Sequence, residues 1–181
     1  MNYHKELIDT IEKNQLEIES GIEVLAQLIL DVSVQNKSIW LIGNGGSASS
    51  IEHFETDLSY LKFPNKSNIK LSALSANSSL ITAASNDISF QDVFSALLQK
   101  KSENGDLLIA VSASGNSKNI IKATLTARNL GLKTFGLIGF DGGLLRNLCD
   151  YKLVVTTGLY KYELVEDIHL SILHAVKLRL L

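Results

Sequence analysis

The sequence predicts an α/β fold in which a parallel, five-stranded sheet lies between two layers of helices. Two observations lead to this prediction. Five short and nearly continuous apolar runs suit strands that are buried on both faces, and helical patterns separate these runs along the chain. The runs are, in order, SIWLIG, IKLSALS, LLIAVSAS, KTFGLIGF and YKLVVTT. Such alternation of strand and helix is typical of parallel sheets.

Length and composition indicate one globular domain over residues 1–181. The chain is long enough to bury a sizeable core, and its 45% hydrophobic and 20% charged residues are ordinary values. The net charge of -2 argues against nucleic acid as a partner, and no apolar run is long enough to predict a membrane span. The single cysteine, Cys149, excludes a cysteine-based zinc site within one chain. Together with a polar, acidic N-terminus, these features predict a cytoplasmic protein.

Helical patterns fill the segments around the expected strands. The N-terminal pattern covers residues 3–32, with Gly21 as a possible kink, and we expect this segment to pack on the core or on a neighbouring subunit. Further helices are expected over residues 49–61, 78–99 with a break near Asn86, 118–130, 144–148 and 162–181.

The first candidate anion-binding loop is GNGGSASS, residues 43–50, between an expected strand and an expected helix. Its glycines permit positive φ angles and let the backbone approach a ligand closely. The free N–H groups of the helix start, and the hydroxyls of Ser47, Ser49 and Ser50, could all face an anion. A tight turn with serine caps is the structural alternative.

A second loop of the same kind, SASGNSKN, occupies residues 112–119 after another buried strand. It offers the hydroxyls of Ser112, Ser114 and Ser117, and Gly115 permits the turn. Ligands of parallel sheets bind outside the carboxyl ends of the strands, which is where both loops are expected. Two such loops in one small domain predict a site for a phosphorylated small molecule.

Two other phosphate-binding motifs do not account for these loops. GNGGSA fits the dinucleotide pattern G-x-G-x-x-A, but the second expected strand, IKLSALSAN, lacks the acidic residue that would bind the ribose hydroxyls. The P-loop pattern G-x-x-x-x-G-K-[ST] is absent. A nicotinamide cofactor and a P-loop ATPase are therefore not expected.

Two histidines and nearby carboxylates predict a metal or acid–base site. His53 and Asp57 are four residues apart and share one helix face, although a simple surface pair is the alternative. On the terminal helix, Glu166 and His174 are separated by about 80° around the axis. Asp167 is a rival to Glu166, because it is separated from His174 by only about 20°. Such a set of imidazoles and carboxylates suits a zinc ion.

With these motifs the sequence resembles the sugar isomerase (SIS) domain family, in particular its phosphoheptose isomerase branch. The resemblance rests on GNGGSASSIEHF and SASGNSKN, with SND at residues 85–87, DGG at 141–143 and EDIHLSILH in the terminal helix. It implies a three-layer α/β/α SIS fold and a homotetramer with active sites between subunits. It also implies conversion of sedoheptulose 7-phosphate to D-glycero-D-manno-heptose 7-phosphate, for the heptoses of lipopolysaccharide or capsule.

The resemblance also implies roles for particular residues. Asp57 and His174 match the acid–base pair, and His53, Asp57, Glu166 and His174 match the ligands of members that bind one zinc ion per subunit. Asp57 stands where the family has glutamate, and Glu166 where it has glutamine. Asp87 is expected to cap or orient the site. The expected substrate and phosphate contacts are Asn44, Gly45, Gly46, Ser47, Asp87, Ser112, Ser114, Asn116 and Ser117.

Two alternative functions stay open at this point. Some close SIS relatives are non-catalytic tetramers that bind a phosphosugar or a partner protein, such as the regulator of the replication initiator. Retention of His53, Asp57 and His174 favours the enzyme. The second alternative is an isomerase of another sugar phosphate, because Tyr60-Leu61 replaces the family's Gly-Arg and could reshape the pocket.

Overall fold

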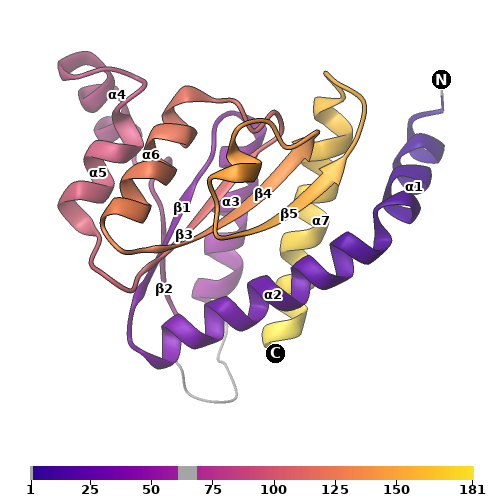
Figure 1. Cartoon of the computed structure of the whole chain (residues 1–181), viewed down its shortest axis with the longest axis horizontal. Coiled ribbons are helices and arrows are strands. Elements are labelled where there is room, and N and C mark those ends of the chain that lie inside the picture. The colour runs from indigo at the N-terminus through magenta and orange to yellow at the C-terminus, as the bar shows by residue number, and fades with distance from the viewer. Residues whose placement is uncertain (1, 61–68) are drawn as a thin grey trace.

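Five strands form one parallel sheet between two groups of helices, which confirms the predicted fold class (Figure 1). The structure is a computed structural model that describes residues 2–60 and 69–181. Its strands are β1 Ser38–Ile42, β2 Lys70–Ala73, β3 Leu107–Ser112, β4 Lys133–Phe140 and β5 Tyr151–Thr156, in the spatial order β2-β1-β3-β4-β5.

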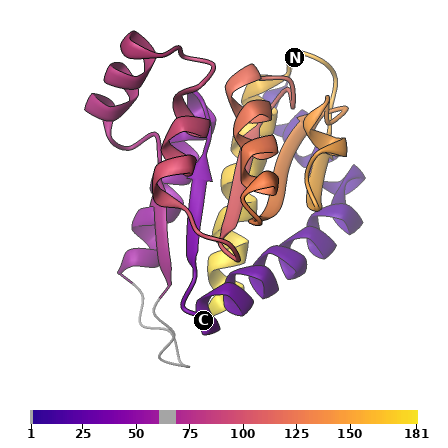
Figure 2. The ribbon, with the colours of Figure 1, turned by 60° about the vertical axis from the view of Figure 1, so that its left-hand side comes forward.

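Helices cover both faces of this sheet. They are α1 Tyr3–Lys13, α2 Gln15–Val34, α3 Gly46–Ser59, α4 Ser78–Asp87, α5 Val93–Lys101, α6 Lys118–Asn129 and α7 Tyr162–Leu180, with a 3-10 turn, η1, at Leu145–Asn147. One face is covered by α2, α3 and α7, and the other by α5, α6 and η1, with α4 packed beside α5 at the edge of this second layer (Figure 2). Within the described residues, no helix is both long and apolar enough to cross a membrane.

Two apolar cores result from the alternation of side chains along the strands. In β3, Leu107, Ile109 and Val111 face the α2–α3–α7 side, whereas Leu108 and Ala110 face the α5–α6 side. All of these side chains are fully or almost fully buried. The continuous apolar run of this strand is therefore explained by burial on both faces.

The N-terminal helical segment breaks at Asn14, and α2 continues through Gly21 without a break. The buried Asn14 side chain accepts a hydrogen bond from the Thr156 N–H at 2.8 Å and donates one to the Thr156 carbonyl at 3.1 Å. The break therefore anchors the junction of α1 and α2 to the end of β5. Gly21 lies inside α2, where a Cβ atom would come within 2.3 Å of Leu153 Cδ1. Glycine is needed there because α2 packs closely on the core of its own chain.

Other boundaries differ slightly from the prediction. Helix α3 begins at Gly46 rather than at Ser49, so a loop glycine itself opens the helix. The expected end of this helix at Leu61 lies outside the described residues. The predicted break near Asn86 is confirmed, since α4 ends at Asp87 and α5 begins at Val93.

The strand order creates the place for a ligand. Strands β1 and β3 are neighbours in the sheet, but the chain leaves β1 toward β2 on one side and leaves β3 toward β4 on the other. A parallel sheet has its topological switch point at such a place, and ligands bind in the crevice between the two diverging loops. The loops after β1 and β3 are the two predicted anion loops.

His169 of α7 is a completely buried histidine with no hydrogen-bond partner for either ring nitrogen in the described part of the chain. Burial lowers the pKa of His169 to about 4, and the nearby main chain of Ile138 offsets this only in part. The imidazole is therefore neutral in the folded protein at pH 7.

We predict that His169 makes the folded protein less stable as the pH falls. The unfolded chain protonates this residue near its ordinary pKa of 6.5, whereas the folded protein does so only near 4. Over this interval the free energy of unfolding should decrease by at most about 1.4 kcal/mol per pH unit through His169. Urea unfolding at pH 7 and pH 5 should show a smaller loss of stability in His169→Leu than in the wild type.

His4→Leu is the matched control, because His4 is exposed. It should lose as much stability between the two pH values as the wild type does. An equally large loss in His169→Leu would contradict the prediction.

Candidate functional site

The two predicted anion loops are joined by a reciprocal pair of amide hydrogen bonds. Asn44 Nδ2 donates to Asn119 Oδ1, and Asn119 Nδ2 donates to Asn44 Oδ1, both at 2.9 Å. Asn119 is buried, so loss of either partner would leave an amide group unpaired inside the protein. The pair therefore fixes the two loops relative to each other. Sequence reasoning missed Asn119 as a site residue, although it ends the second loop motif.

A small pocket of about 120 Å³ opens between these loops. The N-termini of α3 and α6 border it, and neither N-cap residue forms a side-chain cap hydrogen bond in the described structure. Uncapped helix N-termini carry N–H groups and partial positive charge that favour an anion. The lining residues are the predicted Asn44, Ser47, Ser112, Ser114, Ser117 and Glu166, together with Val111, Ala113 and Tyr162.

The first loop contributes one serine to the pocket rather than three. Ser47 lines the pocket, whereas Ser49 is exposed and Ser50 donates its hydroxyl to the Gly46 carbonyl at 3.1 Å. Gly45 is the N-cap of α3 and has a φ angle of +53°, a conformation that favours glycine.

The second loop is supported by the DGG turn at residues 141–143. The Gly115 N–H donates to Ser112 Oγ at 3.1 Å, and Leu144 N–H donates to Asn116 Oδ1 at 3.0 Å. Gly115 has a φ angle of +62°, and a Cβ atom there would come within 2.1 Å of the Gly142 carbonyl oxygen. Asn116 and Gly115 therefore shape the loop, and the Ser112 hydroxyl keeps its proton for a ligand.

Glu166 reaches from α7 into this anion pocket. A Cβ atom on Gly46 would lie only 2.3 Å from the Glu166 carboxyl group, so the absence of a side chain at Gly46 makes room for the carboxylate. Burial raises the pKa of Glu166, and the negative charges of Glu163 and Asp167 raise it further. A phosphate bound in the pocket would meet this carboxylate as a charge of the same sign.

Two other predicted acidic residues lie away from the pocket. Asp167, the rival to Glu166, accepts a hydrogen bond of 2.6 Å from the Tyr3 hydroxyl of α1. This bond raises the pKa of Tyr3 to about 12. Asp87 has an exposed side chain at the end of α4 and accepts a hydrogen bond from Asn86. Its role in orienting the site stays a prediction.

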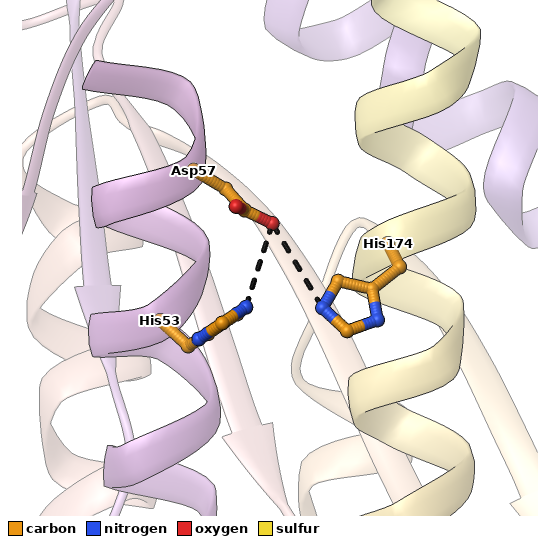
Figure 3. Close-up of side chains that lie close together, drawn as sticks. All are labelled: His53, Asp57 and His174. Carbon is orange, nitrogen blue, oxygen red and sulfur yellow. Dashed lines mark ion pairs between the residues drawn. The ribbon is translucent and has the colours of Figure 1, made fainter. Parts of the chain in front are cut away.

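His53, Asp57 and His174 form a compact cluster between α3 and α7 (Figure 3). Asp57 Oδ2 lies 3.6 Å from His53 Nε2 and 3.8 Å from His174 Nε2. The two imidazole rings meet edge to face with centroids 5.1 Å apart. Figure 3 shows that two of these side chains come from α3 and the third from α7, so packing of the two helices assembles the cluster.

The cluster suits a divalent metal ion. Asp57 Oδ2 is buried without a hydrogen-bond partner in the described structure, and two imidazole nitrogens lie beside it. Histidine nitrogen and carboxylate oxygen are ordinary zinc ligands, and tetrahedral zinc holds neighbouring ligand atoms about 3.4 Å apart. Small side-chain movements would give that geometry. Neither Glu166 nor Asp167 belongs to this cluster of the described residues, so the role of Glu166 as a ligand stays a prediction.

Lys177 of α7 binds the same carboxylate. Its Nζ atom donates to Asp57 Oδ1 at 2.7 Å, whereas Oδ2 faces the two histidines. Sequence reasoning missed this residue. Lys177 follows His174 by three residues on the same helix, and this spacing could have indicated that both side chains lie on one face.

Comparison with known proteins places this architecture in a family. The SIS domain matches residues 2–139. The chain belongs to the SIS domain family. A phosphoheptose isomerase from Chlorobaculum parvum is 36% identical to this SIS chain in an alignment of 179 residues that covers 97% of this chain and 83% of that protein. One from Campylobacter concisus is 32% identical over 181 residues, covering 94% and 95% of the two chains.

Among solved structures, the phosphoheptose isomerase of Neisseria gonorrhoeae has a TM-score of 0.88 and 26% identity to this chain. The similarity covers 98% of this chain and 94% of that one. It therefore includes α7, which lies beyond the matched SIS domain and carries His174 and Lys177. The resemblance to the phosphoheptose isomerase branch is confirmed.

Glu166→Gln should bind inorganic phosphate more tightly than the wild type. The substitution removes a negative charge from the pocket and keeps the length of the side chain. Loss of like-charge repulsion at such short range should lower the Kd about tenfold at low ionic strength. Isothermal titration calorimetry at pH 8 measures this.

Glu163→Gln is the matched control, because it removes the same charge from an exposed position one turn earlier on α7. It should change the Kd much less, because solvent screens exposed charges. Equal effects of the two substitutions, or none, would show that the Glu166 carboxylate does not face the bound anion.

Proposed function

We infer that this chain is an aldose–ketose isomerase that interconverts sedoheptulose 7-phosphate and D-glycero-D-manno-heptose 7-phosphate. The observation that carries this inference is the placement of an anion pocket and a His–Asp cluster at two points along the same helix pair. Ser47 and Glu166 line the pocket, whereas Asp57 and His174 lie in the cluster. Helices α3 and α7 therefore both run from the pocket toward the cluster.

The spacing along these helices fits a phosphorylated sugar of about seven carbons. Ser47 precedes His53 by six residues and Glu166 precedes His174 by eight, which correspond to rises of about 9 and 12 Å. With carbon–carbon bonds of about 1.5 Å, C1 of an extended heptose 7-phosphate lies about 10 Å from its phosphorus. A phosphate held at the loops would therefore place C1 and C2 beside the cluster.

The side chains of the cluster suit the proton transfers of such an isomerisation. The ketose loses a proton from C1, passes through an enediol and regains a proton at C2. We assign the transfer between the two carbons to the Asp57 carboxylate, and a transfer between the two oxygens to His174. The loops fix the far end of the substrate, which holds the reacting carbons near these groups.

Zinc is the metal that we propose for the cluster, one ion per subunit. His53, Asp57 and His174 would hold it; Glu166 lines the anion pocket and lies outside this cluster of the described residues. When bound, it would supply Lewis-acid polarisation of the substrate carbonyl. The products of phosphoheptose isomerisation fit the supply of heptoses for surface glycans.

Turnover of sedoheptulose 7-phosphate, followed by NMR with and without added zinc, tests the proposal. Asp57→Asn and His174→Ala should each lower kcat by at least about 10²-fold, because each removes a proton-transfer group. Asp31→Asn, on α2 outside the pocket and cluster, is the control and should leave kcat unchanged. A wild-type protein that binds phosphate without turnover would instead indicate a non-catalytic phosphosugar-binding protein.

A homotetramer with active sites at subunit interfaces is also proposed. The side chains of His53 and His174 are 53% and 45% exposed, so a neighbouring subunit could cover the open side of the cluster. Large apolar side chains of α2 and α7, Leu16 and Leu178, are also exposed. Light scattering at micromolar concentration should give four times the mass of one chain; the mass of a monomer would contradict it.

A further inference from the structure

We propose that Lys177 is an internal cation that competes with a metal ion for Asp57 and thereby sets the metal affinity of the cluster. The inference rests on the metal-binding part of the proposed function. It concerns a residue that neither the loop motifs nor the expected ligand set includes.

The contact is a shielded ion pair rather than a surface pair. Lys177 Nζ lies 2.7 Å from Asp57 Oδ1, and the two side chains are 26% and 16% exposed. An ammonium and a carboxylate in such a position interact more strongly than a solvated pair, because less water screens their charges. Lys177 therefore holds one oxygen of Asp57 firmly.

The other oxygen of the same carboxylate is the one that faces the two histidines. Asp57 Oδ2 has no hydrogen-bond partner in the described structure and lies 3.6 and 3.8 Å from the imidazole nitrogens. A metal ion at His53 and His174 would thus share Asp57 with Lys177, one cation on each oxygen. The negative charge of Asp57 would be divided between them.

Lys177 has two opposing effects on a metal ion. Its hydrogen bond orients the carboxylate so that Oδ2 points toward the histidines, which favours binding. Its positive charge disfavours binding in two ways. It repels a dication held by the neighbouring carboxylate oxygen, and it already compensates the negative charge of Asp57. We expect the repulsion to dominate. The Coulomb energy between Lys177 and a doubly charged metal ion is twice that for a singly charged ion, whereas the orienting effect is worth only one hydrogen bond. The expected result is a weak and exchangeable metal site.

Equilibrium dialysis with Zn²⁺ and with Co²⁺ tests the competition. Lys177→Met keeps most of the length of the side chain and removes the charge, and it should lower the metal Kd at least tenfold relative to the wild type. Lys177→Arg keeps the charge and should bind metal as weakly as the wild type. Lys122→Met is the matched control, since Lys122 pairs with Asp92 elsewhere on the protein; its Kd should be unchanged.

Three results would overturn the proposal: an unchanged or higher Kd in Lys177→Met, no bound metal in either protein, or tight binding that survives in the double variant His53→Ala with Lys177→Met. Lys177→Gln replaces Lys177→Met if thermal unfolding shows that the latter does not fold. Dialysis measures metal binding and not turnover, so the test remains valid even if the wild-type protein is inactive as an isomerase. Equally, an unchanged Kd in Lys177→Met leaves the isomerase assignment in place.

Discussion

The packing of α7 beside α3 is the contact on which the site depends. Ile51, Phe54 and Leu58 of α3 share one buried core with Leu173 and Val176 of α7. Each such side chain contributes about 1.5–3 kcal/mol through burial, so together they outweigh the few polar contacts of the cluster. The rotation of α7 against α3 is therefore set by apolar packing. That rotation determines that His174 and Lys177 meet Asp57.

Two charged residues of α7 each have the same sign of charge as the ligand proposed for their end of the site. Glu166 places a negative charge in the anion pocket, and Lys177 places a positive charge on the carboxylate of the cluster. Without ligands, the Glu166 carboxylate lies beside the partial positive charge of the α3 N-terminus, and Lys177 compensates Asp57. On the proposed function, phosphate and metal would each bind against a like charge that the protein already holds there. Moderate affinity at both points follows, and for the phosphate it suits a product that must be released after turnover.

The sequence predicts well what depends on short stretches of chain. The apolar runs predicted five strands, and the glycines and serines after two of them predicted loops that line the pocket. His53 and Asp57 were paired correctly because four residues on a helix fix their separation. The break at Asn14 could not be predicted, because it depends on Thr156, which is distant in sequence. For the same reason the contacts of Glu166 with Gly46 and of Lys177 with Asp57 require knowledge of how α7 packs.

The order of the strands explains why two separate loops can act on one substrate. Only because β3 lies directly beside β1 do Asn44 and Asn119 come close enough to pair. On the proposed function, this pair fixes the phosphate end of the site on the sheet, whereas the helix contact about two turns away fixes the cluster. The distance between the two ends therefore depends on the rise along α3 and α7 rather than on any side chain between them. A shorter sugar phosphate anchored at the same loops would leave its carbonyl short of Asp57 and His174. Discrimination by chain length then needs no residue that recognises the middle of the sugar.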